Sequence, residues 1–144
     1  MITSTQQKNL TLKQIESLNR QLNAKPKPGV PEALVKAHRA QTREEIAELR
    51  DEIDQYEAAC VADYMKLKFN SYEDMLRAPI IIRLASKLST EKFAKRVGIS
   101  ESQIKRYEQE EYLNAPGNVV QKILSIFGIN ITAKAAEYRL QRHA

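Results

Sequence analysis

Few residues of this chain are of the types that catalysis or metal binding requires. His38 and His143 are the only histidines and lie far apart in the sequence, and Cys60 is the single cysteine. Metal sites in proteins need several such ligands at short, regular spacings, so this sparse set argues against one. The four glycines, at positions 29, 98, 117 and 128, are too scattered for a phosphate-binding loop. We therefore expect a protein without enzymatic activity, metal or cofactor.

Residues 90–109 show a more informative pattern, because apolar and small side chains stand at fixed intervals along this segment. Two short helices joined by three residues cross at a steep angle, so the positions between them must be apolar or small. Ala94 stands where a larger side chain would separate the helices, and Gly98 stands where the tight turn needs a positive φ. The spacing predicts a helix-turn-helix, although a hairpin in a purely structural bundle would share it. The expected inward positions are Phe93, Val97, Ile99, Ile104 and Tyr107.

The residues around this segment resemble a known family. Residues 83–89, 93–100 and 104–108 are similar to the Cro and lambda-repressor, or Xre-like, DNA-binding domain. The similarity covers about residues 76–130. It implies a compact helical bundle that binds operator DNA, commonly as a dimer, in phage repressors, bacterial regulators and antitoxins. The helical extension before the domain also resembles a group of bacterial regulators of this type.

The resemblance implies that residues 101–109 form the recognition helix, whose N-terminal end enters the major groove. In that position Arg106 would bond to a guanine and Gln103 to an adenine, and Glu101 would accept from cytosine or repel other bases. Ser102 is short enough for a close approach to the bases. Contacts to phosphate are expected from Thr90, Lys92, Ser100 and Lys105, together with the main-chain amides at positions 89 and 100.

Charge is divided unevenly along the chain. Residues 1–78 hold 12 basic and 12 acidic residues, whereas residues 79–144 hold 11 basic and 6 acidic ones, a net charge of +5. A basic segment beside a neutral one is typical of a protein whose halves bind a polyanion and another protein. A chance excess of surface lysines is the alternative interpretation. The glutamates at positions 108, 110 and 111 are expected to lie on a solvated surface.

The composition favours helices throughout. The chain has 144 residues, of which 42% are hydrophobic, and it contains only four glycines and five prolines. This length suits one domain, or a small domain with an appendage. We predict an all-α protein in which a lambda-repressor-like helix-turn-helix bundle at residues 76–144 follows a helical region at residues 1–75. The latter would serve in dimerisation or partner binding.

Two helices are expected in the first region. Thr11 and Gln14 stand at the two positions of a capping box, which predicts a helix over residues 11–23. Residues 25–31 contain three prolines and a glycine and cannot continue it. A second helix is expected from residue 32 to about residue 70. Its heptad-like seam fits an intramolecular hairpin or a dimer equally well, and consists of Ile46, Leu49, Ile53, Tyr56 and Cys60.

The second region divides into short helices. Pro79 suits the first turn of one helix, and Ser89 caps the next. Ser100 caps a third helix, and Gly128 ends a fourth. Residues 131–140 are expected to form a last helix.

Nothing in the sequence indicates export or a membrane. A single cysteine forms no intramolecular disulfide, and the first ten residues lack the apolar stretch of a signal peptide. The longest apolar runs are too short to span a bilayer. We expect a cytoplasmic protein with no membrane partner.

Taken together, these features lead us to expect a sequence-specific transcriptional regulator. It would be a repressor that binds double-stranded DNA as a homodimer, at a palindromic operator with half-sites one helical turn apart. One alternative is an antitoxin, in which residues 1–75 neutralise a toxin protein while the domain represses its own operon. Another is a helical interaction module that has kept the fold but lost DNA binding.

Overall fold

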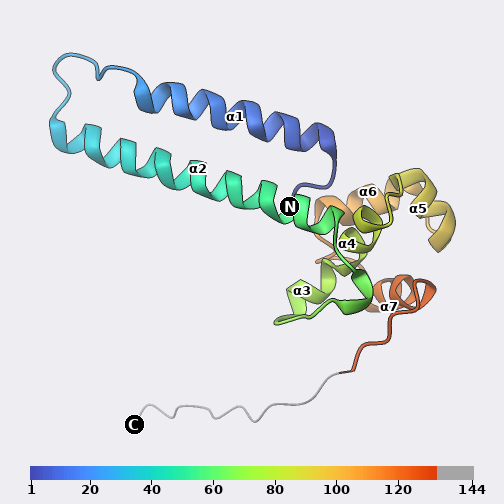
Figure 1. Ribbon diagram of the computed structural model, residues 1–144. Helices are drawn as coiled ribbons and strands as arrows, with labels where there is room; N and C mark the ends of the chain where they lie inside the picture. The colour runs from blue at the N-terminus through green and yellow to red at the C-terminus, as the bar shows by residue number, and fades with distance from the viewer. Residues whose placement is uncertain (133–144) are drawn as a thin grey trace, which may run out of the picture.

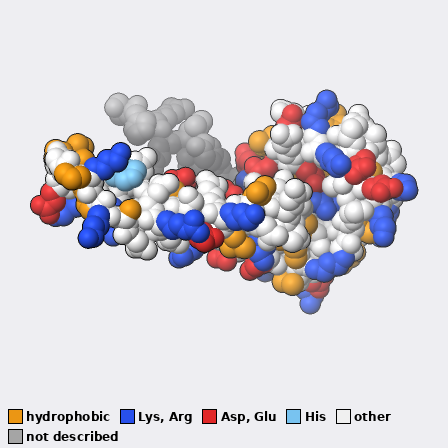
Figure 2. All heavy atoms as spheres, turned by 90° about the horizontal axis from the view of Figure 1, so that it is seen from above, with side chains coloured by type: hydrophobic (Ala, Val, Ile, Leu, Met, Phe, Trp, Pro, Cys, Tyr) orange, Lys and Arg blue, Asp and Glu red, His pale blue; other side chains and the backbone are white. Residues whose placement is uncertain are grey.

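A computed structural model of the chain describes residues 1–132, and over this range the protein is all-helical. A long helical hairpin projects from a compact bundle of shorter helices (Figures 1 and 2). The predicted all-α fold class is thus confirmed, whereas the helix expected at residues 131–140 lies almost wholly outside the described residues. The elements are α1 (Thr5–Asn23), α2 (Glu32–Cys60), the 3-10 helix η1 (Tyr64–Lys66), α3 (Tyr72–Leu76), α4 (Ala78–Ala85), α5 (Thr90–Val97), α6 (Glu101–Gln109) and α7 (Gly117–Ile126).

The hairpin pairs α1 with α2 in antiparallel fashion (Figure 1). The connector at residues 25–31 is non-helical, as its prolines predict, and Gly29 turns it with a φ of +85°. The seam of α2 packs against α1 of the same chain, so the intramolecular alternative is the one observed. The buried residues of the pair are Ile15, Leu18, Thr42, Ile46, Ile53, Tyr56 and Ala59.

Two of the predicted helix ends are wrong. Helix α1 begins at Thr5, where the Ser4 hydroxyl accepts from the Gln7 amide at 3.2 Å, and Thr11 lies inside the helix. The Thr11 hydroxyl instead donates to the Gln7 carbonyl at 3.0 Å, which satisfies it without a cap. Helix α2 ends at Cys60, about ten residues early, because the chain turns there to pack Tyr64, Leu67 and Phe69 against the bundle.

The bundle of α3 to α7 has the predicted caps. Ser89 and Ser100 each accept a hydrogen bond from the amide three residues on, and Pro79 stands in the first turn of α4. Phe127 is buried in the bundle, with its ring stacked 5.6 Å from that of Phe93. The side chains that are essentially inaccessible include Ile80, Ile82, Phe93, Val97, Ile104, Tyr112 and Ile123.

The base of the hairpin is fixed to the bundle. Ile2 is only 4% exposed and belongs to the same hydrophobic core as the helices of the bundle. The Lys87 ammonium donates to the carbonyl of Cys60, which satisfies one of the open groups at the end of α2. The expected boundary at residues 75 and 76 falls inside α3. Buried residues of both predicted regions also belong to one hydrophobic core.

Candidate nucleic-acid interface

Helices α5 and α6 form the predicted helix-turn-helix. Ala94 is buried between them, and Gly98 adopts a φ of +71° in the turn. The amides of Gly98 and Ile99 both donate to the Ala94 carbonyl, at 2.9 and 3.1 Å, which ends α5 with a left-handed residue. Among the expected inward residues, Ile99 is half-buried and the others are buried, so the packing inferred from the spacing is confirmed.

The outer face of α6 is polar and accessible. Ile104 and Tyr107 anchor the helix in the core, which turns Ser102, Gln103, Lys105 and Arg106 toward solvent. The Arg106 guanidinium lies 5.9 Å from the centre of the Tyr107 ring. An exposed face carrying an amide, a guanidinium and an ammonium has the donors that base edges and phosphates accept.

The N-terminal end of α6 is also open to solvent. Ser100 caps it, since its hydroxyl accepts from the Gln103 amide at 3.4 Å, and Ser102 and Gln103 beside it are exposed. The unpaired amides of a helix N-terminus favour a negatively charged partner. The positive end of α6 and its exposed polar residues therefore lie at the same solvent-facing site.

Three of the expected DNA-contacting residues form one network. The Thr90 hydroxyl donates to the Glu101 carboxylate at 2.8 Å, and the Lys105 ammonium lies 3.1 Å from the same oxygen. The Thr90 hydrogen bond, followed by that of Lys105, lowers the pKa of Glu101 below its ordinary value. Glu101 thus carries a negative charge at neutral pH and holds the first residue of α5 against α6. Lys92 lies apart from this network, exposed on α5.

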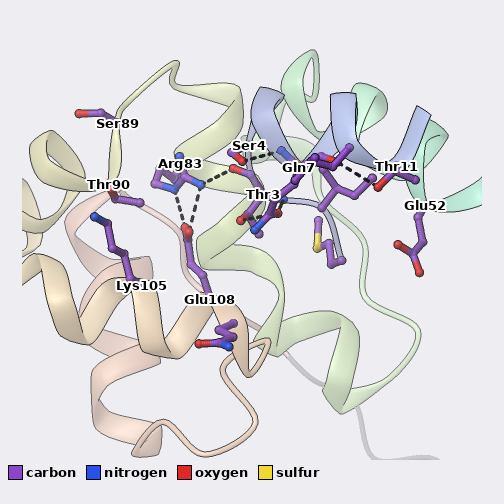
Figure 3. Close-up of a pocket in the computed structure, with 14 residues that line it drawn as sticks. Thr3, Ser4, Gln7, Thr11, Glu52, Arg83, Ser89, Thr90, Lys105 and Glu108 are labelled. Carbon is purple, nitrogen blue, oxygen red and sulfur yellow. Dashed lines mark hydrogen bonds and ion pairs between the residues drawn. The ribbon is translucent and has the colours of Figure 1, made fainter. Parts of the chain in front are cut away.

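A buried ion pair behind α6 was not foreseen from the sequence. Glu108, expected on a solvated surface, is only 4% exposed, and both of its carboxylate oxygens accept from the Arg83 guanidinium (Figure 3). The same guanidinium donates to the carbonyls of Leu88, at 3.1 Å, and Thr3, at 2.7 Å. Burial raises the pKa of Glu108, and the hydrogen bonds and charge of Arg83 oppose that rise.

The expectation for Glu108 was wrong because its burial depends on Arg83 of α4 and on the segment before α1, both of which are distant in the sequence. The one available signal was Arg83, a charged residue within the apolar run of α4. A charge in that setting requires a buried partner. Arg83 therefore ties three separate parts of the chain together, namely α4, α6 and the segment before α1.

A groove of about 820 Å³ separates α6 from the base of the hairpin (Figure 3). Lys105 and Thr90 line one side of it, and Ser4, Gln7 and Glu52 line the other. The hairpin therefore begins directly beside the flank of α6.

Within residues 1–132 no group of histidine, cysteine and acidic side chains is arranged to hold a metal ion. No helix in this range is both long and apolar enough to cross a membrane.

One comparison with protein families gives a match to the bundle. Residues 81–133 match a family model described as helix-turn-helix, of the Cro/C1, Xre-like type. The match covers α5, α6, α7 and most of α4, and it indicates a DNA-binding helix-turn-helix regulator. The search of curated proteins found no match, and neither did the search of solved structures. The hairpin lies outside the matched segment.

Proposed function

We propose that this protein is a transcriptional repressor that binds a palindromic operator as a homodimer, with α6 in the major groove. The observation that carries the proposal is the polar outer face of α6, which stands on a helix-turn-helix whose sequence matches a DNA-binding family. The major groove of B-DNA admits a helix and presents a distinct hydrogen-bonding pattern for each base pair.

Within this proposal the exposed residues divide by role. Gln103 and Arg106 contact base edges, and Ser102 allows the helix to approach closely. Lys92, Lys105 and the capped N-terminus of α6 contact phosphates, which set register and affinity without reading sequence. Thr90 and Glu101 fix the angle between α5 and α6 through their hydrogen bond.

The antitoxin function is the second candidate. It is supported by the hairpin, which lies outside the matched segment and exposes Leu34 and Val30 at its free end. It would differ from a free-standing repressor in one respect, because residues 1–75 would also bind and neutralise a toxin protein. Coexpression with a small protein encoded beside this gene, followed by growth measurement, distinguishes the two.

The test is fluorescence anisotropy with a DNA fragment from upstream of the protein's own gene and a shuffled fragment, each at two salt concentrations. Specific readout predicts a preference for the upstream fragment that survives the higher salt. Arg106→Ala should relax specificity at one base position and cost about 1 to 3 kcal/mol. Lys92→Ala should weaken binding to both fragments alike and lower the salt slope by about 1.

Lys13→Ala, an exposed change on α1, serves as the control and should leave both affinities unchanged. A uniform loss of affinity for Arg106→Ala would contradict its role at a base. No binding to either fragment would favour an interaction module over a repressor.

A further inference from the structure

The hairpin carries opposite charges in its two halves. The free half, residues 20–43, holds six basic residues and one acidic residue, a net charge of +5. The half next to the bundle, residues 5–19 and 44–60, holds three basic and eight acidic residues, a net charge of −5. The first region is neutral in total, but the hairpin within it has a positive free half and a negative half next to the bundle.

Most of these acidic charges have no ion-pair partner within the described part of the chain. Glu16 pairs with Arg20 and Glu57 with Lys8, both at 2.5 Å. The six others have no ion pair with residues 1–132 and are Glu44, Glu45, Glu48, Asp51, Glu52 and Asp54. An acidic surface of this kind is available to a basic partner.

The free end has the complementary character. A groove of about 500 Å³ lies between the connector and α2, and its apolar lining residues include Val30 and Leu34. Lys25, Lys27 and His38 also line it. Figure 2 shows hydrophobic and basic side chains side by side at this end of the hairpin.

One face of α2 connects the two ends. Positions 34, 38, 41, 45, 48 and 52 alternate steps of four and three, so their side chains form a single stripe beside the buried seam. The stripe runs from Leu34 and His38 at the free end to Glu45, Glu48 and Glu52 near the bundle. Exposed Leu10 lines the same groove as Glu52, so an apolar side chain accompanies each charged end.

We propose that two copies of the chain dimerise through this stripe with their hairpins antiparallel. The free end of each hairpin then lies on the bundle-proximal half of the other, with Lys25 and Lys27 against Glu45, Glu48 and Glu52. Leu34, which is 61% exposed, packs against Leu10 of the second copy, which is 59% exposed. A two-fold axis near residue 43 creates both contacts at once, as an isologous interface requires.

A second copy fits this surface better than another protein does. An unrelated acidic partner would cover the basic free end and leave the acidic half without a counterpart. A parallel pairing would place like charges together at both ends, which is repulsive. An antiparallel second copy places an opposite charge against both the basic and the acidic half of the hairpin. This proposal specifies the dimer of the proposed repressor and rests on it, but its test uses no DNA, so failure to dimerise and failure to bind an operator are separate results.

The test is sedimentation equilibrium of the full chain and of charge-reversed variants. The wild type should be a dimer at low salt, with a dissociation constant that rises with ionic strength. Lys25→Glu with Lys27→Glu should raise that constant at least tenfold, as should Glu45→Lys with Glu48→Lys. Mixing the two variants should restore a heterodimer, because the reversed ends again attract. A monomeric wild type, or no recovery in the mixture, would overturn the proposal.

Lys36→Glu with Arg43→Glu is the matched control. It makes the same change in net charge on the opposite side of α2, since each residue turns the helix by about 100°. It should weaken the dimer much less than the change at Lys25 and Lys27. An equal loss would show that the stripe is not the interface.

Cysteine cross-linking tests the direction of pairing in a chain that carries Cys60→Ser. Leu34→Cys mixed with Glu52→Cys should form a disulfide between chains, and Leu34→Cys alone should not. A disulfide between two Leu34→Cys chains would establish a parallel pairing and overturn the antiparallel one.

Discussion

Arg83 and Glu108 show what one buried charge imposes on its surroundings. The Glu108 carboxylate is buried, and it is stabilised there because a guanidinium contacts both of its oxygens. That guanidinium also satisfies the carbonyl of Thr3, which is 80 residues distant in sequence. The position of α6 in the bundle thus depends on a contact with the segment that precedes the hairpin.

Removing one partner of this pair should be costly. Glu108→Gln leaves the Arg83 guanidinium buried without a counter-charge and should lower the free energy of unfolding by about 3 to 5 kcal/mol. The double change Arg83→Met with Glu108→Leu should cost less than either single change. Urea denaturation of the wild type, Arg83→Met, Glu108→Leu and the double variant measures the coupling, and exposed Glu91→Gln, whose pair with Lys95 is worth about 1 kcal/mol or less, is the control. Additive losses would contradict a direct pair.

The hydroxyl of Thr90 lowers the pKa of Glu101. Its hydrogen bond is the largest cause of the lowered pKa, so Thr90→Val should raise the pKa of Glu101 toward its ordinary value. Because the folded pKa is lowered, the interaction is present above the ordinary carboxyl pKa and is lost as pH falls through the folded value. Carboxyl-carbon NMR titration measures the change. Thr90→Ser keeps the hydroxyl and should leave the pKa low, and an unchanged pKa in Thr90→Val would remove this role.

At the scale of the element, the turn between α5 and α6 depends on one backbone conformation. Gly98 has a φ of +71°, and a Cβ built there would lie 3.5 Å from the Lys122 ammonium, an ordinary contact. The requirement for glycine is therefore conformational, not steric. This turn also sets the orientation of α6 in the bundle and therefore which face of α6 is exposed to DNA.

Gly98→Ala should lower the free energy of unfolding by about 1 kcal/mol, because an L-residue in the left-handed region is strained. Gly117→Ala is the control, since Gly117 opens α7 and a Cβ there meets open space. That change should be neutral or add about 0.4 to 1 kcal/mol by reducing the entropy of the unfolded chain. Thermal denaturation compares them, and equal effects at the two glycines would refute the conformational argument.

At the scale of the whole molecule, the proposed antiparallel dimer would set the distance between its two DNA-binding bundles. An axis near residue 43 lies about 26 Å from the end of α2 at a rise of 1.5 Å per residue, so the two ends of α2 are about 50 Å apart in the antiparallel dimer. That exceeds the separation of about 34 Å between half-sites one helical turn apart. The sequence-based expectation of a one-turn operator therefore does not fit this dimer.

Each bundle lies beyond the end of its α2 (Figure 1), so the two recognition helices are farther apart than the ends of α2. We therefore predict half-sites two helical turns apart, about 68 Å, a spacing that presents both to the same side of the DNA. Anisotropy with two copies of a half-site, at spacings from 10 to 30 base pairs, should give the tightest binding near about 20 base pairs. Lys25→Glu with Lys27→Glu should abolish that optimum and leave binding to a single half-site unchanged. A maximum at one turn would rule out the antiparallel hairpin dimer on DNA.

The sequence by itself determined the features that depend on neighbouring residues. The serine caps of α5 and α6, the glycine that ends α5 and the inward positions of the helix-turn-helix each follow from contacts within a few residues or from the fixed period of a helix. The roles given to Gln103, Lys105 and Arg106 rest on the family resemblance and stay predictions. Their exposure on α6 is a consequence of where Ile104 and Tyr107 point.

Tertiary structure decided what depends on residues far apart in the chain. The burial of Glu108 requires Arg83 at 25 residues' distance, and the early end of α2 requires a bundle against which residues 61–71 can fold. Helix α1 begins at Thr5 and not near Thr11, because packing against α2 extends it, with the Thr5 and Tyr56 hydroxyls 3.2 Å apart. Local sequence determines which conformations are low in free energy, and long-range burial of apolar and charged groups selects among them.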